Sequence, residues 1–217
     1  MARNKAQDWP SQYLGFGLRC VPMLPQSKAP YKAEIPDSLT GWHIQFMDRL
    51  EAWNTFIRTH RLCNTAILWP GTQVDCDSQA AMAWTREHGI TRADRAWILK
   101  TSRGYRLFYK TVDKTLRPVI DNCHEKPDLL PPGRLAIVPD SIHPSGYAYS
   151  WLNGYSPLDI PLTEIQEVPA PIVEYWQSHS QAARYPHEDK PSPGWLGLVC
   201  MNLQILWGRG FFPGQVI

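Results

Sequence analysis

Several features that would narrow the function at once are missing from this sequence. The net charge is only +2 over 217 residues, so a strongly basic nucleic-acid binder is excluded and any DNA contact must come from a local patch. No run approaches the roughly 18 apolar residues of a membrane span. No GxxxxGK[ST] sequence is present, so we expect no helicase motor in this chain.

The cysteines also form no recognisable framework. There are five, an odd number, and no pair has CxxC spacing, so we expect reduced thiols and no zinc. The first ten residues are polar and lack the apolar core of a signal peptide, which favours a cytoplasmic location without a membrane partner.

What is present indicates a folded α/β domain of short elements. Hydrophobic residues make up 43% of the chain, enough for a core, while twenty prolines punctuate it frequently. Apolar spacing predicts a helix over 45–60, and Ser78 is a plausible N-cap of a helix over 78–88. Further expected elements are a helix end and strand within 11–24, two strands within 64–77 and an apolar strand within 96–101, before a turn at 102–104. Strands at 105–110, 134–138 and 147–151 and a helix within 163–179 complete the set.

The chain changes character near residue 180. Residues 187–195 (HEDKPSPGW) resemble a linker, and residues 196–207 (LGLVCMNLQILW) are apolar. We therefore expect a main domain over 1–179 and a tail over 180–217 that is not part of the catalytic core.

Asp75 and Asp77 form the pattern most typical of a chemical site. On a strand, residues i and i+2 point to the same face, roughly 6–7 Å apart. Two carboxylates on one face repel each other unless a cation lies between them, and a divalent metal is a common reason for this arrangement. A solvated strand end before a helix cap is the alternative, and the pair alone favours that alternative by about two to one.

The order of the neighbouring motifs points further. The first motif is a helix, a Gly turn, a strand and a Lys-x-Pro loop, and the second is a Trp-bearing helix followed by an Asn. The third is Asp-x-Asp, and the fourth is a Thr and a Gly-rich turn that lead into a strand. The fifth is Pro-Asp, and the sixth is a Ser-x-His segment that ends in Trp. They occupy 13–30, 53–68, 74–77, 101–109, 127–128 and 139–151. In this order they resemble the N-terminal domain of bifunctional DNA primase/polymerases, part of the archaeo-eukaryotic primase superfamily.

The resemblance implies a fold and a set of roles. The fold is α/β (α+β), with an RRM-like mixed sheet carrying the metal site and N-terminal helix-strand units packed beside it. Asp75, Asp77 and Asp128 match the acidic residues that bind two Mg²⁺ or Mn²⁺ ions and carry catalysis. The residues matched to nucleotide binding are Lys28, Arg106, Ser141 and His143.

The chain departs from the family pattern at two places. Arg106 stands where the family has a histidine facing the triphosphate. Arginine binds phosphate bidentately but keeps its proton at neutral pH, so it cannot act as an acid or base there. Asp140 replaces a proline and adds negative charge near the phosphate site. Both departures predict impaired activity.

Three functions remain open at this point. The first is template-directed nucleotidyl transfer, as a primase or polymerase, in replication of a plasmid, phage or other mobile element. Its partners are a DNA template and primer, dNTP or NTP, and a helicase, either separate or as a lost C-terminal region. The second is a weakened or inactive nucleotide- or DNA-binding module of a replication protein. The third is an unrelated α/β protein with chance motifs.

Overall fold

The computed structural model describes residues 8–31, 49–59, 63–91, 94–110 and 115–180. Its strands are β1 (Arg19–Met23), β2 (Asn64–Trp69), β3 (Thr72–Cys76), β4 (Trp97–Lys100), β5 (Tyr105–Tyr109), β6 (Asp128–Leu130), β7 (Arg134–Val138) and β8 (Ser150–Trp151). Its helices are α1 (Trp9–Gly15), α2 (Leu50–Thr59), α3 (Gln79–Glu87), the 3-10 turn η1 (Leu162–Glu164) and α4 (Ala170–Ser180).

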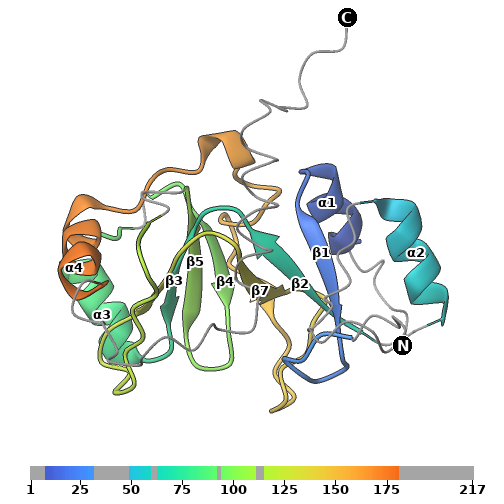
Figure 1. Ribbon diagram of the computed structural model, residues 1–217, viewed down its shortest axis with the longest axis horizontal. Helices are drawn as coiled ribbons and strands as arrows, with labels where there is room; N and C mark the ends of the chain where they lie inside the picture. The colour runs from blue at the N-terminus through green and yellow to red at the C-terminus, as the bar shows by residue number, and fades with distance from the viewer. Residues whose placement is uncertain (1–7, 32–48, 60–62, 92–93, 111–114, 181–217) are drawn as a thin grey trace, which may run out of the picture.

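The strands form two sheets. One has the order β1-β2-β7 and the other the order β6-β3-β5-β4-β8. The chain passes from one sheet to the other between β2 and β3 through a tight turn at Pro70 and Gly71. A Cβ at Gly71 would overlap the carbonyl oxygen of Tyr109, so the turn requires glycine. Figure 1 shows the two sheets side by side, with α3 and α4 at one end of the molecule and α1 and α2 at the other.

The five-stranded sheet is antiparallel, which corrects the mixed sheet that we expected. Every pairing within it is antiparallel. β3 and β4 are joined through α3 and run in the same direction, but β5 lies between them in the sheet. This inserted strand follows β4 through a short turn, so β3 and β4 do not pair with each other and each hydrogen-bonds an antiparallel neighbour.

A core rich in aromatic residues joins the two sheets. Trp69 and Trp97 are buried with ring centroids 5.1 Å apart, and Phe108 lies 5.2 Å from Trp69. The side chains of Tyr13 and Cys20 from the N-terminal elements belong to the same cluster, so these elements pack beside the five-stranded sheet.

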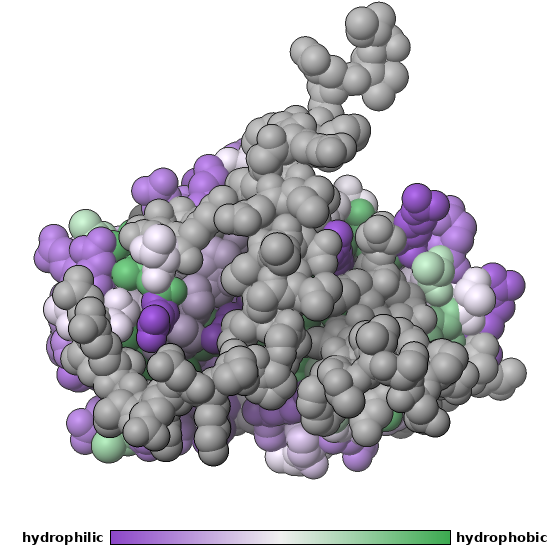
Figure 2. Space-filling view, viewed as in Figure 1, coloured by the Kyte–Doolittle hydropathy of each residue, from purple (hydrophilic) through white to green (hydrophobic). Residues whose placement is uncertain are grey.

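The opposite face of the five-stranded sheet is covered by α3 and α4. Ile172 and Trp176 of α4 are fully buried there against strand residues such as Val74 and Leu129. Trp84 of α3 contacts Tyr175 of α4 at 4.8 Å between ring centroids. Hydrophilic residues dominate the outer ends of the molecule, around these helices and around α2 (Figure 2).

Most expected elements are confirmed within one to four residues at their ends. Ser78 caps α3 as expected, since its hydroxyl accepts a hydrogen bond from the Ala81 amide at 3.0 Å. The helix expected over 45–60 is described only from its later part, α2. The helix expected over 163–179 begins only at Ala170, directly after Pro169, and carries Pro171 in its first turn. The predicted tail lies outside the described residues beyond Ser180. Among the described residues no helix is long and apolar enough to cross a membrane.

Candidate functional site

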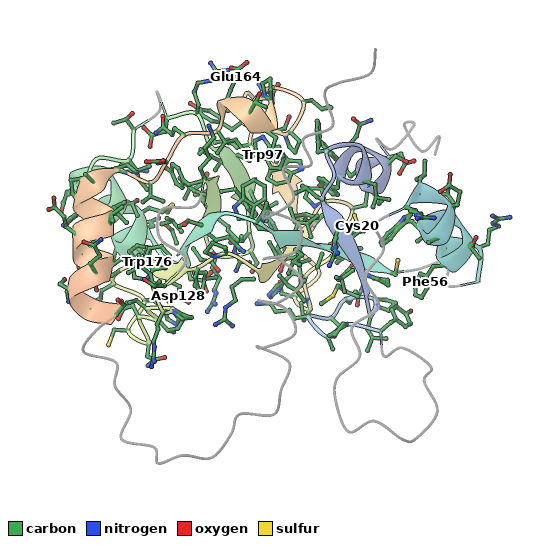
Figure 3. The ribbon with its side chains drawn as sticks, turned by 45° about the horizontal axis from the view of Figure 1, so that its top comes forward. Cys20, Phe56, Trp97, Asp128, Glu164 and Trp176 are labelled. Carbon is green, nitrogen blue, oxygen red and sulfur yellow. The ribbon has the colours of Figure 1, made fainter. Side chains whose placement is uncertain are left out.

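Strand register brings the candidate residues together. Asp75, near the end of β3, lies directly opposite Arg106 of β5 on one side and Asp128 of β6 on the other. Directly opposed residues on neighbouring strands have Cα atoms roughly 4.5–5.5 Å apart and share one face of the sheet. Two of the three predicted carboxylates are therefore adjacent across a β ladder, and Figure 3 shows Asp128 at the same end of the sheet as Trp176 of α4.

Asp75 is the most buried of these carboxylates. Its residue is 7% exposed, and its Oδ2 pairs with the guanidinium of Arg106. The pair leaves two buried atoms without a partner, Oδ1 of Asp75 and Nε of Arg106. Buried polar atoms normally have hydrogen-bond partners. The pair is therefore an incompletely satisfied arrangement that another charged group could complete.

Asp77 follows β3 and lies beside a short turn. Its carboxylate pairs with the guanidinium of Arg103. The turn is held by the Thr101 hydroxyl, which accepts a hydrogen bond from the Gly104 amide at 3.0 Å. A Cβ on Gly104 would overlap the carbonyl oxygen of Cys76, so glycine lets the turn lie against the end of β3.

Asp128 carries the electrostatic signature of clustered carboxylates. Burial raises the pKa of its carboxyl above the ordinary value, and the charges of Asp75 and Asp77 raise it further. The amide of Asp121 donates a hydrogen bond to its Oδ1 at 2.9 Å, which acts in the opposite direction. These three carboxyl groups are therefore close enough to repel one another.

A cavity of about 220 Å³ opens beside this cluster. Five charged residues line it, and apolar side chains of β1, β4 and β7 form much of the remaining wall. The five are Lys28, Asp75, Asp77, Arg103 and Arg106; His143 also lines the cavity. Burial lowers the pKa of His143, and the positive charges of Lys28 and Arg103 lower it further, so the imidazole is neutral at neutral pH.

Ser141 lies elsewhere. It is 1% exposed, and its hydroxyl donates to the carbonyl of Thr65 at 3.0 Å and accepts from the Thr65 amide at 2.8 Å. The Asn64 side chain adds a second link. It donates to the carbonyls of Ser27 and Ile142 at 3.2 and 2.8 Å. Together these bonds fasten the loops that carry Lys28 and His143 to the start of β2.

Sequence reasoning missed Arg103, Asn64 and Tyr149. Arg103 stands in the same Thr-Ser-Arg-Gly turn as a recognised motif, so its proximity to Asp77 had a local signal, but the ion pair depends on how the turn packs. Asn64 was noted only as part of a motif. Tyr149 lines the cavity from the segment after His143, and burial raises the pKa of its hydroxyl.

The donor set fits a divalent cation by its chemistry. Carboxylate oxygens are the ligands that Mg²⁺ and Mn²⁺ prefer, and the unpartnered Oδ1 of Asp75 is a buried acceptor within this set. The side chains are not arranged as a ligand group, since in the described part of the chain no three His, Cys, Asp or Glu side chains are placed to hold an ion. Two of the carboxylates are instead held by Arg103 and Arg106.

A larger cavity, about 550 Å³, lies on the helix-covered face of the five-stranded sheet. Its walls are mostly apolar, from residues such as Met82, Ile98 and Leu107, and Arg86 is the one charged residue in its lining. The smaller cavity is therefore the better candidate for chemistry on charged substrates, because it gathers charges of both signs.

Comparison with known proteins places the chain in a family. The model of the bifunctional DNA primase/polymerase N-terminal domain (Prim-Pol) matches residues 11–171, well over half of the chain, and this range contains every candidate residue described above. The comparisons found no matching curated protein and no matching solved structure. The chain therefore belongs to the bifunctional DNA primase/polymerase N-terminal family, and this membership implies nucleotidyl transfer of the primase and polymerase type in DNA replication.

Proposed function

We propose that the chain catalyses template-directed extension of nucleic acid from nucleoside triphosphates, using the carboxylates of Asp75, Asp77 and Asp128. The observation that carries the proposal is the strand register that sets Asp128 directly beside Asp75, in a chain of the Prim-Pol family. Such a register supports the proposal because it brings two carboxylates more than fifty positions apart in the sequence to one place in the sheet.

Each group in the cavity has a role in this proposal. The three carboxylates hold the divalent cations, Mg²⁺ or Mn²⁺. When bound, such ions activate the primer 3′-hydroxyl and neutralise the triphosphate and the departing pyrophosphate. Lys28 and Arg106 bind phosphate oxygens, the latter bidentately. The neutral imidazole of His143 can donate one ring N–H to the nucleotide while its Nδ1 stays 2.8 Å from the Ser145 hydroxyl.

Ser141 supports nucleotide binding indirectly. Because both of its hydrogen bonds go to Thr65, the hydroxyl positions the loop that carries His143. We place it among the positioning residues of the proposed nucleotide site. The replication context that suits such an enzyme is a plasmid, phage or other mobile element, with a DNA template and primer as partners and a helicase acting beside it.

Primer extension with Mg²⁺ and with Mn²⁺, run beside a primer-independent assay, tests the proposal. We expect extension by the wild type and loss of it in Asp75→Asn and in Asp128→Asn. Asp159→Asn is the matched control. Asp159 is an exposed carboxylate that accepts a hydrogen bond from the Ser156 amide, and it does not line the cavity. The proposal fails if the wild type extends no primer, or if Asp75→Asn and Asp128→Asn both extend as well as the control.

A second function is favoured by the same ion pairs. Arg103 and Arg106 neutralise two of the three carboxylates. These features suit a nucleotide- or DNA-binding module with weakened catalysis. Binding of a triphosphate without measurable extension, under both metals, would select this function over the first.

A further inference from the structure

Two arginines form ion pairs with the carboxylates that we propose as metal ligands. Arg106 of β5 holds Asp75, and Arg103 of the preceding turn holds Asp77. The two guanidinium groups reach the carboxylates from one strand and its turn, and all four side chains line the same 220 Å³ cavity. The chain thus supplies its own counter-charges to the carboxylates proposed to bind metal.

The two ion pairs differ in how firmly they are held. Side-chain exposure is 21% for Arg106 and 9% for Asp75, and strand register fixes their backbones opposite each other. Arg103 is 54% exposed and lies on a turn, so its ion pair can open at less cost. The buried pair is also incomplete, because Asp75 Oδ1 and Arg106 Nε have no partner. A cation would satisfy the first atom and an anion the second.

Charge balance determines what can enter. The carboxylates of Asp75 and Asp77 in the cavity wall, with Asp128 beside Asp75 on the neighbouring strand, are offset by the cations of Lys28, Arg103 and Arg106. His143 is neutral at neutral pH. A divalent cation entering alone would leave the cluster strongly positive. A triphosphate entering alone would leave it strongly negative. Two divalent cations entering together with a triphosphate preserve the balance.

We propose that Arg103 and Arg106 are exchange residues, which hold Asp77 and Asp75 in the empty site and transfer to the phosphates when metal and nucleotide bind together. The inference rests on the proposed function and deepens it, because it assigns the coupling between the two ligands to particular side chains. It also assigns a role to Arg103. The ligand class is a nucleoside triphosphate with a divalent cation.

The exchange has a thermodynamic consequence. In this exchange the metal releases the guanidinium groups for the phosphates, and the triphosphate releases the carboxylates for the metal. The affinity for each ligand therefore rises when the other is bound, and both affinities rise by the same factor. Coupling of this kind commonly amounts to about 5- to 150-fold. Removing one guanidinium should raise the affinity for metal alone, weaken binding of triphosphate alone, and shrink the coupling factor.

The test is a titration of the full chain with Mn²⁺, followed by the electron paramagnetic resonance of the free ion, with and without a non-hydrolysable triphosphate. The proteins are the wild type, Arg106→Gln, Arg103→Gln and the control Arg95→Gln. Arg95 forms an ion pair with Glu164 on the surface, so its variant loses a guanidinium of the same kind outside the cavity. Arg103→Gln keeps the test informative if Arg106→Gln does not fold, because Arg103 is the more exposed arginine.

For the wild type we expect weak Mn²⁺ binding that tightens at least about fivefold with the triphosphate. Both cavity variants should bind Mn²⁺ alone more tightly than the wild type, and Arg95→Gln should match the wild type. The exchange is overturned if the wild type and Arg103→Gln bind Mn²⁺ with equal affinity, or if the triphosphate does not change the Mn²⁺ affinity of the wild type. Either result would leave the proposed function standing. Failure of the wild type to bind either ligand would overturn both.

Discussion

At the scale of single residues, Asp128 shows how clustered charge acts on stability. Its folded-state carboxyl has a raised pKa, first from burial and then from Asp75 and Asp77, so the folded protein binds its proton more tightly than the unfolded chain does. Stability therefore falls as the pH rises from the ordinary aspartate value through the raised one. Above that window the cost is fully present, and below the ordinary value it vanishes.

We predict that Asp128→Asn removes this loss of stability. The amide keeps an oxygen that can accept the Asp121 N–H but carries no charge. The measurement is urea unfolding of both proteins in chelator between about pH 3.5 and about pH 6.5, across the window where the proton binding of the two states differs. The variant should gain stability relative to the wild type as the pH rises. A stability difference that does not change with pH would show that folding does not raise the pKa of Asp128.

Arg106 carries a second prediction at this scale. Arg106→His should raise the rate of primer extension more than it changes nucleotide affinity, because histidine can donate a proton at neutral pH and releases Asp75. General acid catalysis typically contributes about 10²–10⁴-fold, which sets the upper limit of the gain. Single-turnover extension across a nucleotide titration separates rate from affinity.

Arg106→Gln is the matched control for that experiment. Glutamine also releases Asp75 but supplies no acid, so it should not reproduce the gain in rate. If Arg106→His loses nucleotide binding, or extends no faster than an active wild type, the arginine is itself the working residue at this position.

The sequence predicts these residues unequally. Alternation on a strand places Asp75 and Asp77 on one face without any tertiary information. Asp128 could be joined to them only through the family resemblance, since its register against β3 follows from the packing of the whole sheet. The ion pairs of Arg103 and Arg106 were not foreseen, because side-chain partners across strands depend on register that local patterns do not fix.

At the scale of elements, the turn between β4 and β5 positions both arginines. We predict that Gly104→Ala destabilises the protein by about 1–3 kcal/mol, the usual cost of overpacking, since the new Cβ would overlap the Cys76 carbonyl. The shift moves β5 away from the end of β3, so Mn²⁺ binding should change as well. Thermal unfolding and the Mn²⁺ titration measure the two effects.

Gly15→Ala is the control for this substitution. Gly15 has no heavy atom within 4 Å of an added Cβ and lies in α1, where alanine is favoured over glycine. It should leave both measurements unchanged or slightly raise stability. Equal behaviour of the two variants would mean that the turn tolerates a displacement and does not set the site geometry.

The elements themselves were largely predictable, while their pairing was not. Short apolar runs bounded by glycine and proline identified β3, β4, β5 and β7, and the cap identified α3. Nothing local indicates that β5 inserts between β3 and β4, and this insertion makes the sheet antiparallel. The same insertion brings Arg106 next to Asp75, so the error about the sheet and the missed ion pair have one cause.

At the scale of the whole molecule, the boundary of the domain is the remaining question. The family match ends at residue 171, only two residues into α4. The helix nevertheless belongs to the core, because Ile172 and Trp176 are fully buried and the Trp176 indole donates to the carbonyl of Arg117 at 2.6 Å. These contacts place α4, at least as far as Trp176, in the core of the five-stranded sheet.

We predict that a chain ending at Ser180 keeps a cooperative melt and the extension activity of the full chain, while a chain ending at Pro169 loses the cooperative melt. Loss of a buried tryptophan alone costs roughly 3–5 kcal/mol, a large part of the stability of a small domain. Circular dichroism melts and primer extension on both chains provide the comparison. If the chain ending at Ser180 loses its cooperative melt, the apolar segment 196–207 contributes to the core and the boundary near residue 180 is wrong. If it stays folded but loses extension, the segment acts on substrate or on a partner surface and the catalytic unit extends beyond the domain.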